Sequence, residues 1–396
     1  MTPSPSTPQS APPVSEPRRE AAGHASPATA SADPSAVAAP EAAGAGLSGK
    51  NVLLTGGTGF VGRHLLPQLL AAGARVTCLV RATSRTDRLP QGVATAQADL
   101  ATGAGLAAAL KGQDVCIHMA AMLFGLGWQD YLRANALAAR TLAQTCTALG
   151  DAGPARVVLV SSLAATGPCA TAPGVADAMP PAPVSAYGWS KLLAEQILGR
   201  ALGERLVTLR PPIIYGSGDK GLLPVFQGVR RGLAVSPGAG RDFPVSAVHA
   251  EDMAQAVLCA CKPQARGVYH LSDGGVYTMG GFCQVMGAAV RAVTGRPKGP
   301  VRILRLPLPV MALTAGGCSA LACCADALLA RWPRSLGGGR LKRAPNWNLD
   351  KYREARQVGW LCDNSRLCRE LGFAPQVGLE AGMQEAAEGY HREGRL

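Results

Sequence analysis

Short apolar runs alternate with longer amphipathic runs from residue 50 onward. The short runs have the length of buried strands, and the longer runs repeat their apolar positions at the spacing of a helix. Because strands that alternate with helices build a parallel sheet covered on both faces, the pattern predicts a doubly wound α/β fold. The expected strands cover 52–54, 75–80, 93–98, 114–118, 156–160 and 207–209, and the expected helices run from near 60 to near 73, over 105–111 and over 130–149.

Residues 1–47 break this rhythm, because they are mostly Pro, Ala, Ser and Thr with almost no large apolar side chain. Such a segment cannot bury enough surface to offset the entropy lost on ordering, so we expect a disordered tail. No basic stretch followed by an apolar stretch occurs in it, and we therefore do not expect a signal peptide.

The first expected strand runs directly into a glycine-rich turn, TGGTGFVG at 55–62. Gly56 permits a tight turn, Gly59 lets backbone N–H groups approach a pyrophosphate, and Gly62 lets the following helix pack close to the strand. The positive end of that helix then faces the phosphates. Since a strand precedes the turn and a helix follows it, the stretch predicts a dinucleotide site. The residues expected to contact the dinucleotide are Thr55, Gly56, Gly59, Phe60, Val61 and Gly62.

Further candidate contacts follow the next strands. Arg81 comes directly after the second strand, where an arginine favours the 2′-phosphate of NADP over the 2′-hydroxyl of NAD. NAD, with Arg81 as part of a solvated basic loop, is the alternative. Asp99 and Leu100 end the third strand, where a side chain can meet the adenine. Ala120 and Ala121 follow the fourth strand, where small side chains let a cofactor lie against the sheet edge.

A candidate catalytic pair, Tyr187 and Lys191, lies four residues apart and shares one face of an expected helix. A lysine ammonium beside a phenol lowers the pKa of the phenol, which makes tyrosine a usable general acid or base near neutral pH. Ser162, at the end of the fifth strand, can orient a substrate oxygen. Taken alone, the spacing also fits an ordinary surface pair. His118 is expected to support its loop. Asn135 is expected either to lie on the polar surface of its helix or to serve a water or proton path.

Together these motifs resemble the extended short-chain dehydrogenase/reductase family, the NAD(P)-dependent epimerase/dehydratase group. The resemblance covers about residues 50–395. It rests on the order and spacing of TGGTGFVG at 55–62, HMAA at 118–121, Asn135, SSLAATG at 161–167, YGWSK at 187–191, RPPIIYG at 210–216, VHAEDMA at 248–254 and LGFAP at 371–375. Within the family, the chain looks nearest to the steroid dehydrogenase and dihydroflavonol reductase branch.

The resemblance implies a catalytic Ser–Tyr–Lys set, which carries over to Ser162, Tyr187 and Lys191. Ser162 is preferred to Ser161 because it lies five residues before Gly167, as the family's serine does before its glycine. In the family the lysine also contacts the nicotinamide ribose. The segment near the nicotinamide carries over to Pro211, Pro212 and Ile213.

The resemblance also divides the folded part into a nucleotide-binding Rossmann domain over 48–215 and a mainly substrate-binding lobe over 216–396. Strands near 245–272 are expected to return to the core. His249 and Asp252 match a structural motif that joins the lobe to the core, and we assign them no catalysis. Arg241 is either a contact to an anionic substrate group or an ordinary surface arginine. The chain departs from the family at Thr166, where a tyrosine often stands.

Charge is unevenly distributed along the chain. The net charge is +13, and residues 1–49 carry −2 of it, so the remainder carries +15. A basic fold favours anionic ligands or an anionic membrane surface, since no nucleic-acid-binding module is recognisable. Residues 291–343 hold ten Lys and Arg against one acid, Asp326, and the twenty residues before Asp326 are uncharged. We expect an apolar helix that covers the substrate pocket, with a helix on a membrane surface or a membrane span as alternatives.

Twelve cysteines are scattered without metal-ligand spacing, which favours small buried hydrophobes in a reducing cytoplasm. The first functional hypothesis is an NADP-dependent oxidoreductase acting on a secondary alcohol or ketone of hydrophobic character, with a homodimer as the family's habit. The second is a nucleotide-sugar epimerase or dehydratase, although Ser185 and Ala186 stand where a dehydratase would have acids. The third is a non-catalytic scaffold stabilised by a cofactor.

Overall fold

A computed structural model of the chain describes residues 44, 46–237, 242–331 and 344–396. The expected tail therefore lies almost wholly outside the described residues, as does Arg241. Leu47 is buried in the core, so the folded part begins before residue 48.

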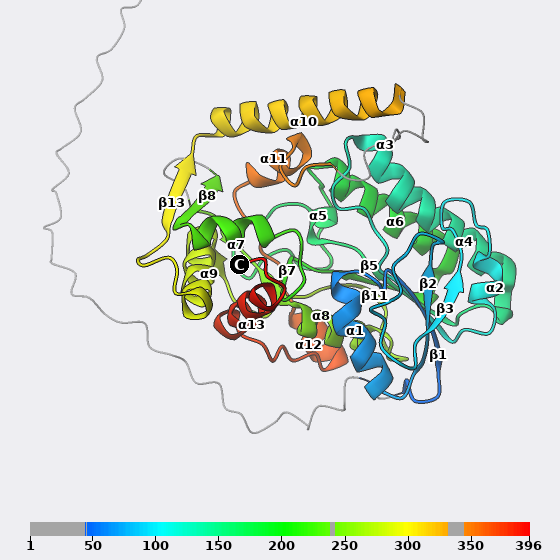
Figure 1. Cartoon of the computed structure of the whole chain (residues 1–396). Coiled ribbons are helices and arrows are strands. Elements are labelled where there is room, and N and C mark those ends of the chain that lie inside the picture. The colour runs from blue at the N-terminus through cyan, green and yellow to red at the C-terminus, as the bar shows by residue number, and fades with distance from the viewer. Residues whose placement is uncertain (1–43, 45, 238–241, 332–343) are drawn as a thin grey trace, which may run out of the picture. The chain divides into compact units, whose positions relative to one another are not determined.

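The described residues form a seven-stranded parallel sheet in the order β11-β6-β5-β4-β1-β2-β3 (Figure 1). The order reverses between β1 and β4, which makes this the switch point at which a doubly wound sheet binds its ligand. Every strand expected from the apolar runs is present, with bounds that shift by two residues at most. The strands are β1 Asn51–Thr55, β2 Arg75–Val80, β3 Ala94–Gln97, β4 Val115–His118, β5 Arg156–Val160, β6 Leu206–Arg210 and β11 Gly267–His270.

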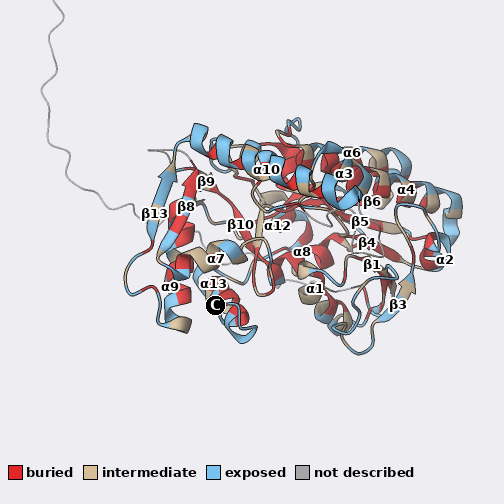
Figure 2. Cartoon of the chain, turned by 45° about the horizontal axis from the view of Figure 1, so that its top comes forward, coloured by how far each residue is buried: buried red, intermediate tan, exposed pale blue. Residues whose placement is uncertain are grey.

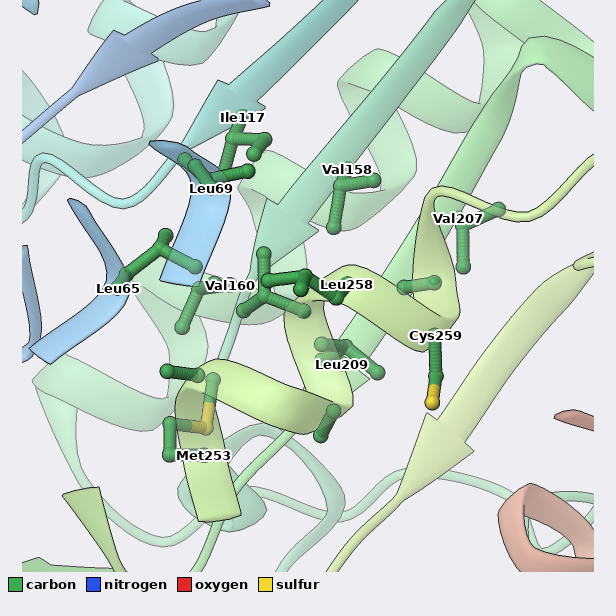
Figure 3. Packing of buried hydrophobic residues seen from close by; sticks show 14 of the residues in the cluster. Leu65, Leu69, Ile117, Val158, Val160, Val207, Leu209, Met253, Leu258 and Cys259 are labelled. Atoms are coloured by element: carbon green, nitrogen blue, oxygen red, sulfur yellow. The ribbon is translucent and has the colours of Figure 1, made fainter. Parts of the chain in front are cut away.

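Helices cover both faces of this sheet, which is why the central strands have no polar face. On one face Leu54 and Ile117 pack with helices α1 and α8, as Figure 3 shows for Leu65 and Met253 of those helices. Adjacent strand residues, such as Leu53, point to the opposite face. The first face carries α1 Phe60–Ala71, α8 Ala250–Ala260 and α12 Ser365–Leu371, and the second carries α2 Leu106–Leu110, α4 Ala138–Leu149 and α6 Ala186–Leu202.

The expected helix over 130–149 is instead three segments, with a π-helical turn in the middle. The segments are α3 Trp128–Tyr131, η1 Leu132–Leu137 and α4. A π-helical turn adds a residue to the helix and often occurs at a functional site. It carries Asn135, which is buried rather than on the surface.

A second hydrophobic cluster builds the lobe, where Phe226, Met286 and Tyr390 pack together. Its helices are α7 Leu223–Arg230, α9 Met279–Thr294 and α13 Leu379–Arg392. Short strands complete it in pairs: β7 Ile213–Tyr215 with β10 Ala247–His249, β8 Leu233–Pro237 with β13 Arg302–Leu306, and β9 Pro244–Val245 with β12 Tyr277–Thr278. Short helical turns are α5 Leu163–Thr166, η2 Gly150–Ala152 and η3 Gly203–Arg205.

The uncharged stretch forms one long helix, α10 Leu308–Arg331, which packs on α11 Leu349–Ala355. Figure 2 shows that most of α10 is exposed. Leu313 and Leu321 are 78% and 72% exposed, so the helix does not bury its apolar surface over a pocket as expected. Within the described ranges, α10 is the one helix whose length and apolar composition would suffice to cross a membrane, with a mean hydropathy of 1.7.

The cysteines expected in the core are there. Cys78, Cys116 and Cys146 are buried, and burial raises the pKa of the Cys78 and Cys146 thiols to about 11. They therefore remain neutral thiols and act as small apolar side chains.

Candidate active site

The glycine-rich turn has the geometry of an anion cradle. Gly56 has a φ of +80°, and a Cβ there would lie 2.9 Å from the backbone N of Ala120. A Cβ on Gly62 would collide with the carbonyl of Gly57. No side chain caps the α1 N-terminus at Gly59, and the first turn of α1 holds no acidic residue. The positive end of α1 is therefore left for an anion, and the turn fits a dinucleotide pyrophosphate.

Thr55 ties this turn to the loop after β4. Its Oγ1 accepts N–H groups from Met119 at 3.2 Å and Ala120 at 3.1 Å, and lies 2.8 Å from Nδ1 of His118. Because the two N–H groups occupy the lone pairs, the Thr55 hydroxyl must donate to Nδ1, which puts the proton of the neutral imidazole on Nε2. Burial and then the nearby Lys191 lower the pKa of His118 to about 3. His118 is therefore a neutral support for its loop, as expected.

The predicted adenosine contacts lie at the same edge of the sheet. Arg81 is exposed at the carboxyl end of β2, and its N–H donates to Oγ of Ser84 at 3.0 Å. Asp99 follows β3, and its Oδ1 accepts the N–H of Ala101 at 2.7 Å, while Leu100 is half-buried. Ala121 is half-buried beside Ala120.

Ser162 and Tyr187 meet where β5 ends and α6 begins. Burial raises the pKa of Tyr187 and the Ser162 side chain opposes this, so the two side chains lie close together. Tyr187 is only 9% exposed. The neighbouring Ser161 is already committed, because its hydroxyl donates to the buried Glu195. This supports the choice of Ser162 as the hydroxyl of the site. The segment after β6 reaches the same place, since the Pro211 carbonyl accepts the N–H of Leu163 at 2.8 Å.

Lys191 lies one turn further along α6 and is 4% exposed. Its Nζ donates to the carbonyl of Val160 at 2.7 Å. Burial lowers the pKa of Lys191 to about 8, although Glu195 opposes this shift. Glu195 itself forms a buried ion pair with Arg210, with 2.5 Å between Oε2 and Nη2, which fixes α6 against β6.

The expected lowering of the Tyr187 pKa by Lys191 is not found. Burial raises the pKa of Tyr187, because the phenolate would lose its water. The opposing cation is Lys351 of α11, whose Nζ lies 4.6 Å from the centre of the Tyr187 ring. Lys191 instead donates to the carbonyl of Val160, so it is not the cation that acts on Tyr187, although both residues share one face of α6.

Helix α11 supplies three charged residues that the sequence motifs do not indicate. Asp350 accepts the N–H groups of Ala186 at 2.6 Å and Tyr187 at 3.1 Å, and so caps α6. Glu354 accepts the Ser185 hydroxyl at 2.7 Å and lies 2.8 Å from Nζ of Lys351. Burial opposes the charge on Lys351, but Glu354 raises its pKa overall, so Lys351 stays protonated.

A signal for α11 is visible in the sequence, although its contact with Tyr187 is not. Asn348 caps the helix, since its Oδ1 accepts the N–H groups of Asp350 and Lys351, both at 3.0 Å. Asparagine before a short charged helical stretch is a recognisable helix start. Which distant side chain the helix would face depends on tertiary packing and could not be predicted.

The Asn135 side chain makes three hydrogen bonds and acts as a structural clamp. Its Oδ1 accepts the N–H of Met122 at 2.8 Å, and its Nδ2 donates to the Met122 carbonyl at 3.2 Å and to Ser190 Oγ at 2.9 Å. It therefore clamps the loop after β4 to α6. Thr166, at the position where the family often has tyrosine, is also buried. Its Oγ1 lies 2.7 Å from Nε2 of His270.

His249 and Asp252 join the lobe to the core, as the resemblance implies. Nε2 of His249 lies 3.2 Å from Oε2 of Glu385 in α13, and Asp252 accepts the N–H groups of Gln376 at 2.9 Å and Val377 at 3.0 Å. Ile213 begins β7, which pairs with the strand that carries His249. Pro212 is half-buried beside it.

Comparisons with known proteins agree with this geometry. The sequence pattern of the NAD dependent epimerase/dehydratase family matches residues 52–272. Ceramide reductase of Caulobacter vibrioides is 32% identical, with 87% of this chain and 96% of the relative covered. Sterol-4-alpha-carboxylate 3-dehydrogenase (decarboxylating) of Dictyostelium discoideum is 28% identical, with 57% and 72% covered.

The same fold occurs in solved structures. UDP-glucose 4-epimerase of Thermus thermophilus in complex with NAD has a TM-score of 0.63 and 21% identity, with 86% of this chain and 99% of that chain covered. Because the family pattern and the first relative each span most of the folded part, the chain belongs to the NAD dependent epimerase/dehydratase family, an enzyme family whose cofactor is NAD or NADP.

Proposed function

We propose that this enzyme is an NADP-preferring oxidoreductase that interconverts a secondary alcohol and a ketone on a hydrophobic, lipid-like substrate. The observation that carries the proposal is the proximity of Ser162 and the buried Tyr187 at the carboxyl edge of the sheet, next to a turn that fits a dinucleotide. The two curated relatives support the substrate class, because one is named for a ceramide and the other for a sterol.

The side chains have complementary roles in this proposal. Ser162 hydrogen-bonds the substrate oxygen, and Tyr187 gives that oxygen its proton in reduction or takes it in oxidation. The nicotinamide, when bound, supplies or accepts the hydride at the substrate carbon. Lys351 stabilises the phenolate formed in reduction. Lys191 holds the end of β5 and would contact the nicotinamide ribose when the cofactor is bound. Burial of Tyr187 keeps water from competing for its proton.

The test of this assignment is Tyr187→Phe in the full chain. NADPH oxidation with a panel of ketones of increasing alkyl length should show activity that rises with chain length and falls by about 10² to 10⁴ in the variant. NADPH binding should persist. Tyr352→Phe, a half-buried tyrosine of α11, serves as the matched control. Full activity in Tyr187→Phe would contradict the role of Tyr187. An unsubstituted chain that binds NADPH but reduces no ketone would instead favour a cofactor-stabilised scaffold.

The NADP preference rests on Arg81 at the carboxyl end of β2. Side-by-side titration should give tighter binding of NADPH than of NADH. Arg81→Ser should weaken the binding of NADPH by about tenfold or more and leave the binding of NADH unchanged, because only NADP has a 2′-phosphate. Arg140→Ser, on the exposed side of α4, is the control and should change neither the NADPH affinity nor the NADH affinity. Equal affinities in the unsubstituted chain would refute the preference.

A nucleotide-sugar epimerase is the second reading, because the matched family includes epimerases by its description. It predicts conversion of a sugar nucleotide without net consumption of NADPH. The dehydratase version is disfavoured, since Ser185 and Ala186 precede Tyr187 and their polar groups are taken by Glu354 and Asp350.

A further inference from the structure

Helix α10 presents an apolar face to solvent along its whole length. Its outward stripe repeats at three- and four-residue steps, which places its members on one side of the helix. Val310, Leu313, Leu321 and Leu328 of this stripe are 44%, 78%, 72% and 59% exposed. The remaining members are Gly317 and Cys324.

The opposite side of α10 is held by the enzyme. Met311, Ala315, Ala322 and Asp326 are buried there. Hydrogen bonds reinforce the packing, because Thr314 Oγ1 accepts Nε1–H of Trp347 at 3.2 Å and Ser319 Oγ accepts the N–H of Leu349 at 3.0 Å. The helix is thus fixed lengthwise on the protein and cannot cross a bilayer without giving up these contacts.

The small β8–β13 sheet continues the exposed apolar surface. Strand β13 leads into α10 through Pro307 (Figure 1). Leu304 of β13 pairs in register with Val235 of β8, and the two are 47% and 49% exposed. Paired residues lie on the same face of a sheet, so these side chains form one patch at the N-terminal end of α10.

Basic side chains flank the apolar stripe. Arg302 and Arg305 precede α10, Arg331 ends it, and all three are exposed. Arg305 pairs with Asp242 at 3.4 Å, which leaves Arg302 and Arg331 as the main basic flanks. Asp326, the one acid of α10, is buried on the inward side, so the outward face has no negative charge to offer. An apolar face bounded by arginines matches the interface of an anionic membrane. Two copies of the chain joined through this face would instead bring Arg302 and Arg331 together, and α10 has no outward acid to pair them.

We propose that α10, together with the exposed face of β8 and β13, docks this enzyme on the surface of a membrane that contains anionic phospholipid. The outward stripe enters the boundary between headgroups and acyl chains, and the arginines contact the headgroup phosphates. Helix α11 links α10 to the site, because it packs against α10 and its Lys351 Nζ lies 4.6 Å from the centre of the Tyr187 ring. Docking therefore brings the active-site side of the enzyme to the membrane.

The first test is vesicle flotation of the full chain, using vesicles of phosphatidylcholine alone and vesicles with about a third phosphatidylglycerol. The enzyme should float with the anionic vesicles and be released as salt rises, because salt screens the arginines. Leu313→Gln combined with Leu321→Gln should reduce binding by about tenfold or more, since two exposed leucines no longer enter the apolar region. Absence of the unsubstituted enzyme from the floating fraction would overturn the proposal.

Matched variants separate the stripe from general stickiness. Val276→Gln removes an apolar residue that is 57% exposed outside the α10 surface and should leave vesicle binding unchanged. Arg302→Gln combined with Arg331→Gln should weaken binding to anionic vesicles by roughly fivefold per arginine and leave binding to phosphatidylcholine unchanged. Equal binding by all variants would overturn the proposal.

Two further readouts exclude other occupants. If analytical ultracentrifugation shows a dimer that the two leucine substitutions dissociate, the face binds a second copy and the proposal fails. If the bound enzyme resists both salt and alkaline carbonate extraction, α10 spans the bilayer and the surface placement fails. The vesicles carry no substrate, so these results do not depend on the proposed oxidoreductase activity, and NADPH binding by each variant reports that it is folded.

Discussion

Tyr187 lies between two lysines that act on the site in different ways. Lys351 faces the ring of Tyr187. Lys191 instead donates to the backbone carbonyl of Val160. The helical spacing of Tyr187 and Lys191 predicted a catalytic pair, but it did not predict that Lys351 is the cation that opposes the effect of burial on Tyr187. Spacing fixes which side chains share a face, while packing decides which charges meet.

Lys351→Met should raise the pKa of Tyr187, because the variant removes the cation that opposes the effect of burial. The limb of the rate–pH profile that reports Tyr187 should therefore move to higher pH, and the rate at neutral pH should fall by about tenfold or less. Lys351→Arg keeps the cation and should restore the profile. A profile that stays in place in Lys351→Met while the rate falls would assign Lys351 a purely structural role.

Because of Lys191, the free energy of unfolding should rise with pH between about 8 and 10.5. The folded-state pKa of Lys191, about 8, lies below the ordinary lysine value of 10.5, so the folded state holds fewer protons between these limits. The cost of burying the charge is full below pH 8 and disappears as pH rises through 10.5. Lys191→Met should thus gain stability relative to the unsubstituted chain at pH 7, and this gain should shrink by about 3 kcal/mol towards pH 10.5. Urea unfolding of both chains across this range gives the difference, and a difference independent of pH would contradict the burial argument.

At the scale of elements, the buried parallel strands were predictable because both faces are covered, which makes each strand a continuous apolar run. The Rossmann turn was predictable because its glycines have a backbone reason to be there. The π-helical turn η1 was not predictable from local spacing, because its Asn135 bonds to Met122 and Ser190, which only tertiary packing brings near. The outward face of α10 was also missed, since composition alone does not tell a covering helix from an exposed one.

Asn135→Ala should show what η1 does. The variant leaves the N–H and carbonyl of Met122 without their partner, whereas the Ser190 hydroxyl still donates to the Tyr187 carbonyl. We expect a loss of about 2 kcal/mol in the free energy of unfolding. The loop after β4 should also exchange its amide hydrogens faster, because Asn135 ties it to α6. Gln144→Ala, at an exposed position of α4, is the control. If both variants lose the same free energy of unfolding, Asn135 contributes no more to stability than an exposed amide side chain does.

At the scale of the whole molecule, the lobe is joined to the nucleotide-binding core through buried polar contacts at the start of α8. Nδ1 of His249 accepts the N–H of Glu251 at 3.3 Å, so the neutral imidazole carries its proton on Nε2 and donates it to Glu385 of α13. Burial opposes ionisation of Glu385, but hydrogen bonds from His249 and Ser217 lower its pKa to about 2. A carboxylate that stays charged at every working pH makes this a permanent joint rather than a switch.

Asp252 is the second half of the joint and gives the most local test of it. Its carboxylate is 1% exposed and receives the two N–H groups that lead into α13, from Gln376 and Val377. Asp252→Ala should lower the free energy of unfolding by about 1–3 kcal/mol, because two charge-assisted hydrogen bonds are lost. Hydrogen exchange should speed up over Leu379–Arg392 and stay slow over β1, since the sheet keeps its own ladder. Glu251→Ala, one residue away and exposed, should leave both regions unchanged. Faster exchange throughout the sheet would mean that Asp252 supports the core itself, and the lobe would then not be a separately anchored unit.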